Sequence, residues 1–277
     1  MSLEALPYTV LILLAELSVG GMIVLFGLDL RGLVAKSFLK LSVIIVLIGA
    51  GLTLLMALGV DAVDDVDGYP LEGSLVGPLR VSFLVFLLAV LPYAFFVWRE
   101  DRTMSMRAGL AAALVGLGAL FFMAYVFSEP TWGLAALMMS LLVGSLSVGA
   151  VTLAMLLGHW YLVTPRLPGR PLEEITLFLL IVLLVQSGLM ILNLALPVRE
   201  VPASESGLGT TLTQSPAFWL RVAVGLVFPL ALAYMAWQSS LTKAMTSATG
   251  LLYVAVGAVL AGEVLARGLL FVTAVPV

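Results

Sequence analysis

Long, uninterrupted apolar runs recur along this chain and limit its fold more than any other feature. Each run covers roughly 20 residues, the length a helix needs to cross a bilayer. Backbone groups in lipid need partners within the chain, so only helices or closed barrels can span a membrane. Barrel strands alternate apolar and polar residues, whereas these runs are continuously apolar. With 62% hydrophobic and 10% charged residues, the sequence predicts an all-α, polytopic membrane helix bundle.

The apolar runs form one transmembrane domain over residues 1–277. Proline and glycine mark several connections, and no connection is long enough for an independent soluble core. The N-terminus has no basic segment with a cleavage site, so we expect no removable signal peptide. The eight predicted spans are 7–29, 37–59, 77–98, 106–127, 134–162, 172–196, 216–238 and 246–273.

Basic residues are concentrated on one side of the predicted membrane. Lys and Arg accumulate in cytoplasmic loops, so their bias sets the orientation. We therefore predict that both termini are extracytoplasmic and that the chain lies in the cell inner (cytoplasmic) membrane. Nine basic residues follow the first, third, fifth and seventh spans: Arg31, Lys36, Lys40, Arg99, Arg102, Arg107, Arg166, Arg170 and Lys243.

The connection 60–76 is acidic and falls on the predicted outer side. We predict that it docks a partner subunit, while a merely solvated loop is the alternative. The net charge of −3 makes nucleic acid an unexpected partner. The acidic residues predicted for docking are Asp61, Asp64, Asp65 and Asp67.

Metal chemistry is restricted by the absence of cysteine and by a single histidine, His159. Cysteine-ligated zinc and iron–sulfur clusters are excluded within this chain, and a bis-histidine haem is impossible in one copy. We therefore expect no bound metal and no haem. His159 precedes Trp160 and Tyr161 and is interpreted as an interfacial residue of an aromatic belt. Its alternatives are a proton-entry group or a single axial haem ligand.

Four charged residues lie inside predicted spans, where each costs at least ~2.5–3.5 kcal/mol on insertion scales. Glu16, Arg221, Glu263 and Arg267 all fall in the outer half of the bilayer. Glu263 and Arg267 are four residues apart and share a helix face. One interpretation is an ion-pair network that locks the first and last two spans together. The other is a polar pocket, open to lipid, that exchanges protons with a quinol.

Other polar and small residues in the spans favour packing. Gln186 and Asn193 are seven apart on one face; we interpret Gln186 as interhelical glue and expect Asn193 to reach the proposed pocket. Small residues in the first and fifth spans allow close helix approach. They include Gly20, Gly21, Gly144, Ser145, Ser147 and Gly149.

The last predicted span has Gly262 and Glu263, then Arg267 and an aromatic residue. With the runs 218–221 and 18–25, this pattern resembles the membrane-anchor subunit of dimethyl sulfoxide reductase and, more distantly, polysulfide-reductase-type anchors. The family's His-Leu-Gly-x-Pro segment has no counterpart, because the corresponding stretch, from the end of the second span, contains no histidine. Either another group acts there, or this chain has lost that function.

The resemblance implies a quinone/quinol-interacting anchor subunit of a respiratory oxidoreductase. It would pass electrons between menaquinol and an iron–sulfur subunit attached to a molybdenum-containing catalytic subunit. We predict Glu263 and Arg267 as the catalytic acid–base pair, with Glu16, Arg221 and Asn193 in the quinone-binding site. The alternatives are a proton- or cation-coupled transporter or channel that uses Glu16 and Glu263, and a purely structural membrane anchor.

Overall fold

The computed structural model is an all-α bundle, as the sequence predicts. It describes residues 4–66, 68–128, 133–164, 168–195, 212–273 and 275–277. Within these ranges, eight helical segments are long and apolar enough to cross a membrane, as expected for a multi-pass membrane protein. The transmembrane helices are α1 (Leu6–Arg31), α2 (Lys36–Gly59), α3 (Val76–Arg99), α4 (Arg102–Val126), α5 (Leu134–Val163), α6 (Arg170–Ala195), the composite α7 (Pro216–Val222), η3 (Ala223–Val227) and α8 (Phe228–Leu241), and α9 (Met245–Thr273).

Local sequence explains where several helices begin and end. Pro7 and Pro216 occupy the first turns of α1 and α7, where a missing N–H costs nothing. Gly32 ends α1 in the left-handed conformation that favours glycine. The Asp101 side chain accepts a hydrogen bond from the Met104 N–H and caps α4. This cap explains why α4 begins earlier than the predicted start at 106.

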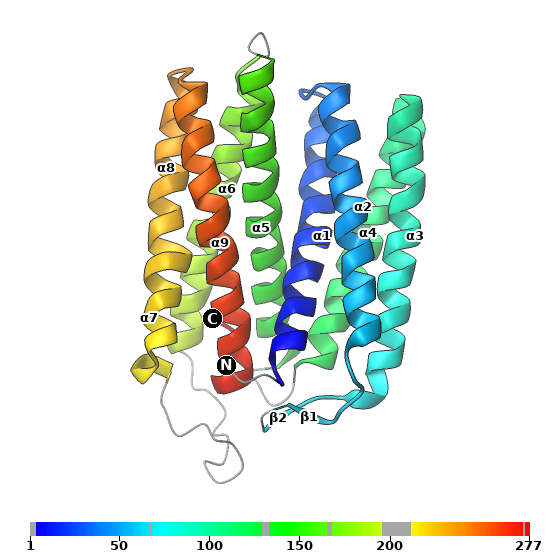
Figure 1. Ribbon diagram of the computed structural model, residues 1–277, viewed down its shortest axis with the longest axis vertical. Helices are drawn as coiled ribbons and strands as arrows, with labels where there is room; N and C mark the ends of the chain where they lie inside the picture. The colour runs from blue at the N-terminus through cyan, green and yellow to red at the C-terminus, as the bar shows by residue number, and fades with distance from the viewer. Residues whose placement is uncertain (1–3, 67, 129–132, 165–167, 196–211, 274) are drawn as a thin grey trace.

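The helices form two groups that meet along α1 and α5 (Figure 1). Helices α1 to α4 pack on one another, and α5, α6, α8 and α9 form the second group. The central apolar stretch is 61% buried in α1, α5 and α9 but 33% buried in the segment containing α3. Helices α1, α5 and α9 therefore form the inside of the bundle, and any charge on their packed faces is removed from lipid.

Close backbone contact joins α1 to α5, as the small residues predict. A Cβ atom on Gly20 would overlap the Ser145 carbonyl, and one on Gly149 would overlap the backbone of Gly20. Neither glycine can therefore be replaced without moving a helix. This tight crossing fixes the two helix groups relative to each other.

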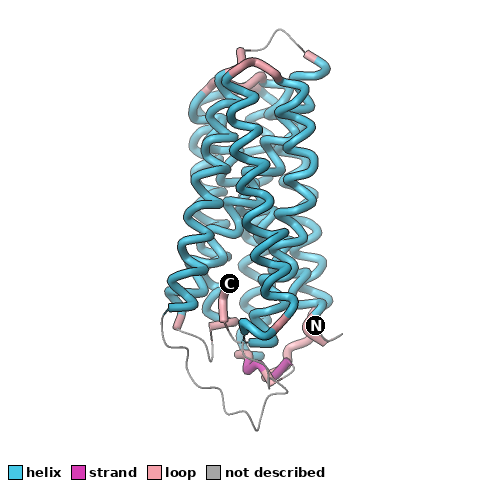
Figure 2. The backbone as a smooth tube through the Cα atoms, turned by 90° about the vertical axis from the view of Figure 1, so that its left-hand side faces the viewer, coloured by secondary structure: helices cyan, strands magenta, loops and turns pink. Residues whose placement is uncertain are grey.

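Both ends of the described chain lie at the same end of the bundle (Figures 1 and 2). The same end holds a small antiparallel hairpin, β1 (Asp65–Val66) and β2 (Tyr69–Pro70), which the sequence did not predict. Its Tyr69 side chain is buried and donates a hydrogen bond to the Phe127 carbonyl. The hairpin is therefore packed against the bundle and is not a free loop. The side of the membrane on which this end lies stays a prediction from the basic residues.

Candidate functional site

The structure brings the four membrane-embedded charges together. Glu16 comes from α1, Arg221 from α7, and Glu263 and Arg267 from α9, and each is 0–1% exposed. We call these four residues the charge cluster. The predicted convergence at one depth is confirmed by their ion pairs. Two carboxylates and two guanidinium groups leave the cluster formally neutral, which reduces the cost of burying it.

Arg267 is the centre of the charge cluster. Its Nη2 atom lies 2.6 Å from Glu16 Oε1 and 3.0 Å from Glu263 Oε2. Its Nη1 atom donates to the Ser140 hydroxyl at 3.1 Å, and Nη2 also donates to the Ser140 carbonyl at 3.3 Å. One side chain thereby joins α1, α5 and α9. The predicted pairing of Glu263 with Arg267 along one helix face is confirmed.

Glu263 has partners at both carboxylate oxygens. Arg221 Nη2 lies 3.2 Å from Oε1, and the Gln186 amide donates to the same oxygen at 2.5 Å. Arg267 contacts the second oxygen. Gln186 joins α6 to α9, as its interpretation as glue predicts, but it does so by binding a charge. Sequence reasoning therefore missed Gln186 as part of the site.

Glycines make room for the charge cluster. A Cβ atom on Gly144 would lie 2.6 Å from Arg267 Nη2, 2.6 Å from Glu16 Oε1 and 3.0 Å from Glu263 Oε2. On the opposite side, Gly225 and Gly262 lie backbone to backbone, and a Cβ on either would also meet Arg221. Gly144 was interpreted as a packing residue from sequence. Its missing side chain is in fact the space that the ions occupy.

A π-helical turn positions Arg221. The turn, η3, lies between α7 and α8 and ends at Val227, two residues before Pro229. Pro229 lacks the N–H that would bond to the Gly225 carbonyl in a regular α-helix. That carbonyl accepts a hydrogen bond from Arg221 Nη1 at 3.3 Å. The irregular turn thus holds the guanidinium against Glu263, and such turns are frequent at functional sites.

Several polar atoms in this region have no hydrogen-bond partner among the described residues. They include Glu16 Oε2, Gln186 Oε1, Arg221 Nε and Arg267 Nε. Glu16 Oε1 forms an ion pair with Arg267 Nη2 at 2.6 Å. Each unsatisfied buried group costs about 1–3 kcal/mol. Unpaired buried donors and acceptors within one group of side chains call for an explanation, such as a bound water or polar ligand.

The two carboxylates of the charge cluster, Glu16 and Glu263, therefore differ in how many polar partners they have. Glu263 is held by two guanidinium groups and an amide. Glu16 contacts one guanidinium through one oxygen, and its other oxygen is open. Both side chains are fully buried. Of the two, Glu16 is the carboxylate whose open oxygen can accept a proton without breaking a hydrogen bond.

The remaining predicted residues lie elsewhere. The Asn193 amide is buried and donates to the Pro276 carbonyl, which ties α6 to the C-terminal segment and not to the charge cluster. His159 is exposed near the opposite end of the bundle, where its Nδ1 lies 2.8 Å from the Tyr253 hydroxyl. Neither residue makes a described contact with the four charges.

The acidic residues predicted for docking lie at the end of the bundle that holds the hairpin. Asp61, Asp64 and Asp65 are exposed, and Asp67 lies outside the described residues. Asp61 and Asp65 line a pocket of about 340 Å³ together with Glu4 and the N-terminal turn of α1. The Asp61 carbonyl accepts a hydrogen bond from Tyr8 at 2.9 Å, which fixes the start of this connection.

Sequence reasoning also missed a buried carboxylate at the other end of α1. Asp29 is 3% exposed, accepts a hydrogen bond from the Tyr93 hydroxyl at 3.1 Å and lies 3.8 Å from Arg102 Nη1. The predicted first span ended at this residue, and the sequence analysis gave its carboxylate no role. The helix instead continues to Arg31, which draws Asp29 into the bundle.

Comparison with known proteins does not identify a family. No family model matches the chain, and no curated protein or solved structure gives a match. The likeness to the dimethyl sulfoxide reductase anchors thus stays an expectation from the sequence.

Proposed function

We propose that this chain is a quinone-interacting membrane anchor subunit of a respiratory oxidoreductase. The observation that supports this most directly is the charge cluster, a neutral group of four ions at membrane depth with one incompletely bound carboxylate. Ionisable residues inside membrane segments are costly and typically mark proton or ligand sites. The sequence resemblance supplies the partner classes, an iron–sulfur subunit and a molybdenum-containing catalytic subunit.

Proton transfer from a quinol to Glu16 is the chemistry that this arrangement favours. The quinol hydroxyl loses its proton to Glu16 Oε2, so one O–H bond breaks as another forms. The cluster then carries one net positive charge beside a quinol monoanion, and the site as a whole stays neutral. Low dielectric makes this compensation necessary, because a lone buried charge is strongly disfavoured. Oxidation of the bound quinol would send two electrons to the iron–sulfur partner, while its second proton and the proton held by Glu16 would leave to the water on the outer side.

Proton transfer to Glu16 differs from the roles predicted from the sequence for the residues of the charge cluster. Glu263 and Arg267 were predicted as the acid–base pair, with Glu16 as a binding residue. Glu16 is the better proton acceptor, because one of its oxygens is open. Glu263 and Arg267 then act as positioning residues that keep Glu16 ionised and oriented before the quinol arrives.

The orientation in this proposal follows the basic residues. The end rich in Lys and Arg faces the cytoplasm, and both termini and the acidic hairpin region face outward. Glu16 lies ten residues beyond the start of α1 at Leu6, or ~15 Å along the helix. The charge cluster is then in the outer half of the cytoplasmic membrane, and the iron–sulfur partner docks on the acidic side.

A static ion-pair lock is the second candidate, favoured by the 0–1% exposure of all four side chains. In that case the cluster would hold α1, α7 and α9 together without binding a ligand. Buried ion pairs of this kind contribute specificity more often than net stability. The two candidates differ in what a conservative change at Glu16 does to turnover.

The test uses the membrane complex isolated with its co-purifying subunits. We expect Glu16→Gln to lower menaquinol oxidation by about 10²-fold or more, the usual contribution of a positioned acid–base group. The matched control is Glu174→Gln, which changes a carboxylate on α6 paired with Arg31 and Arg170. Normal turnover in a folded Glu16→Gln complex would reject the proton role. Isolation without an iron–sulfur protein would reject the anchor assignment.

A further inference from the structure

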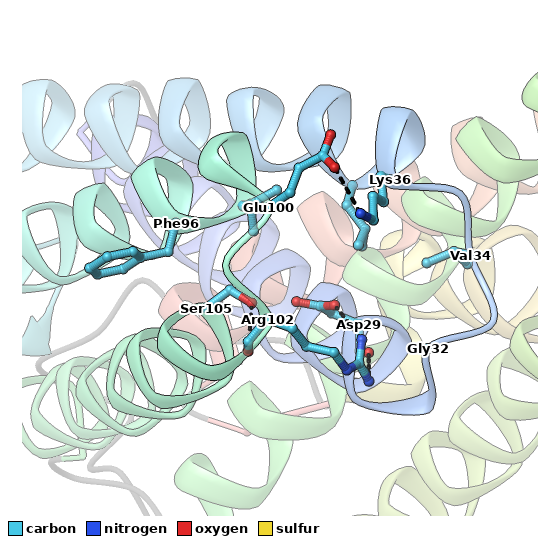
Figure 3. Close-up of a pocket in the computed structure, with 10 residues that line it drawn as sticks. Asp29, Gly32, Val34, Lys36, Phe96, Glu100, Arg102 and Ser105 are labelled. Atoms are coloured by element: carbon cyan, nitrogen blue, oxygen red, sulfur yellow. Dashed lines mark hydrogen bonds and ion pairs between the residues drawn. The ribbon is translucent and has the colours of Figure 1, made fainter.

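A second polar site lies at the end of the bundle opposite the hairpin, among α1, α2, α3 and α4. It is a pocket of about 250 Å³, below the roughly 300–1,000 Å³ of ordinary small-molecule sites. Figure 3 shows charged side chains entering it from all four helices or their ends. The residues that carry the argument are Asp29, Gly32, Lys36, Glu100 and Arg102.

Two ion pairs border this pocket. On one side, Lys36 Nζ on α2 lies 2.7 Å from Glu100 Oε2 at the end of α3. On the other, Arg102 Nη1 at the start of α4 lies 3.8 Å from Asp29 Oδ1 on α1. Figure 3 shows the two pairs apart from each other, and all four residues line the pocket. The lining therefore presents two positive and two negative groups, and Lys40, outside the lining, binds the other oxygen of Glu100 at 2.8 Å.

The Asp29–Arg102 pair is held in place by other hydrogen bonds, but its two side chains are not hydrogen-bonded to each other. Tyr93 donates to Asp29 Oδ2, whereas the 3.8 Å contact at Oδ1 is too long for a hydrogen bond. Arg102 Nη2 reaches the Asp29 and Leu30 carbonyls at 3.4 Å. Gly32 permits this approach, since a Cβ there would lie 3.1 Å from Nη2. Asp29 Oδ1 and the rest of the guanidinium thus keep bonding capacity for a ligand.

The position of the pocket points to lipid. It lies at the ends of helices that are long and apolar enough to cross a membrane, where lipid head groups are expected. Trp98, 55% exposed, and Phe95, 53% exposed, lie close by on α3, and Lys40 Nζ is 5.7 Å from the Trp98 ring centre. Aromatic and basic side chains of this kind mark the membrane interface. Balanced charges in the lining disfavour a purely anionic head group.

We propose that this pocket binds the head group of an amine-bearing zwitterionic phospholipid. The ammonium lies toward Asp29, whose Oδ1 is not hydrogen-bonded to Arg102, and the phosphate lies toward Lys36 and Arg102. Its acyl chains follow the exposed apolar faces of α2 and α3. This inference is independent of the quinone proposal, because the site shares no residue with the charge cluster.

The test is lipid binding to the delipidated full chain in detergent, measured by native mass spectrometry. The probes are phosphatidylethanolamine, phosphatidylcholine and phosphatidylglycerol with the same acyl chains. We expect phosphatidylethanolamine to bind about tenfold more tightly than the other two, the effect of one charge-assisted hydrogen bond. Equal affinities, or a preference for phosphatidylglycerol, would overturn the proposal. Soluble phosphoethanolamine that binds as tightly as the lipid would overturn a lipid occupant.

Variants distinguish lipid binding in this pocket from nonspecific lipid binding elsewhere on the protein. Asp29→Asn should remove the preference for the amine lipid. Val34→Phe should block the pocket without a change in charge, because Val34 lines it. The matched control is Val163→Phe, at a 64% exposed position at the end of α5. The Val34 variant keeps the test valid if the buried Asp29 change prevents folding. Identical lipid binding by the folded Val34→Phe and Val163→Phe proteins would overturn the site.

Discussion

Arg267 on α9 lies 2.6 Å from Glu16 on α1, and this contact joins the two helix groups of the bundle. The same guanidinium also holds Glu263 on its own helix and Ser140 on α5. A single side chain thus connects three of the most buried helices. Substitution of either carboxylate should change both the stability of the helix bundle and the proposed proton transfer. The size of each effect should differ between Glu16 and Glu263.

Glu263→Gln should destabilise the fold more than Glu16→Gln. Loss of Glu263 leaves the buried Arg221 guanidinium with no ion-pair partner among the described residues, and breaking a buried pair costs about 3–5 kcal/mol. Loss of the Glu16 charge leaves both guanidinium groups paired with Glu263, so we expect a cost of about 1–3 kcal/mol. Denaturant unfolding in mixed micelles measures both values. Equal losses would contradict the unequal coordination of the two carboxylates.

Gly144→Ala should disturb the charge cluster although it adds only one methyl group. That methyl would be 2.6 Å from both Arg267 Nη2 and Glu16 Oε1, so the ions must separate or α5 must shift. We expect a loss of stability of about 1–3 kcal/mol, the usual cost of overpacking. Gly257→Ala on α9 is the matched control, because a Cβ there meets nothing within 4 Å. Glycine to alanine in an open helical position should be neutral or slightly stabilising.

Thermal unfolding of the two variants in detergent checks this prediction. A stable Gly144→Ala protein with an unchanged structure would show that the cluster has more room than the contacts indicate.

The fold and the location of the charge cluster follow from the sequence because lipid makes both signals strong. Continuous apolar runs leave no alternative to helices, and a charge inside such a run needs a partner. Glu263 and Arg267 could be paired from their spacing alone. Glu16 and Arg221 could be added because they fall at a similar depth in other spans.

Other features depend on tertiary contacts that no local pattern specifies. The π-helical turn before Pro229 has no clear sequence signal, and the role of Gly144 appears only when α1 and α9 converge on it. Gln186 fits a packing role and a charge-binding role equally well until its partner is known. Asp29 was not singled out, because the predicted span ended there and helix ends are uncertain by a few residues.

Glu100 should give a pH-dependent contribution to stability at the basic end of the bundle. Hydrogen bonds from Lys36 and then Lys40 lower the pKa of Glu100 from 4.5 to about 2. Because the folded-state pKa is the lower one, the stabilisation is fully present above about pH 4.5 and disappears as the pH falls toward 2. The difference in unfolding temperature between the wild type and Glu100→Gln should therefore be constant from pH 7 to about pH 5 and shrink below. High salt should weaken it, since these side chains are exposed.

The final prediction concerns which carboxylate receives the proton. If a quinol transfers its proton to Glu16 Oε2, quinol binding should create a carboxylic-acid C=O absorption in the infrared difference spectrum. Glu16→Gln should remove that band, because the accepting group is gone. Glu263→Gln should keep it if the variant folds, since Glu263 stays ionised between Arg221 and Arg267. Deuterium exchange should shift the band and confirm that it belongs to a protonated carboxyl group. A band that survives in Glu16→Gln and disappears in Glu263→Gln would assign the proton to Glu263, and the open oxygen of Glu16 would then be a site for water alone.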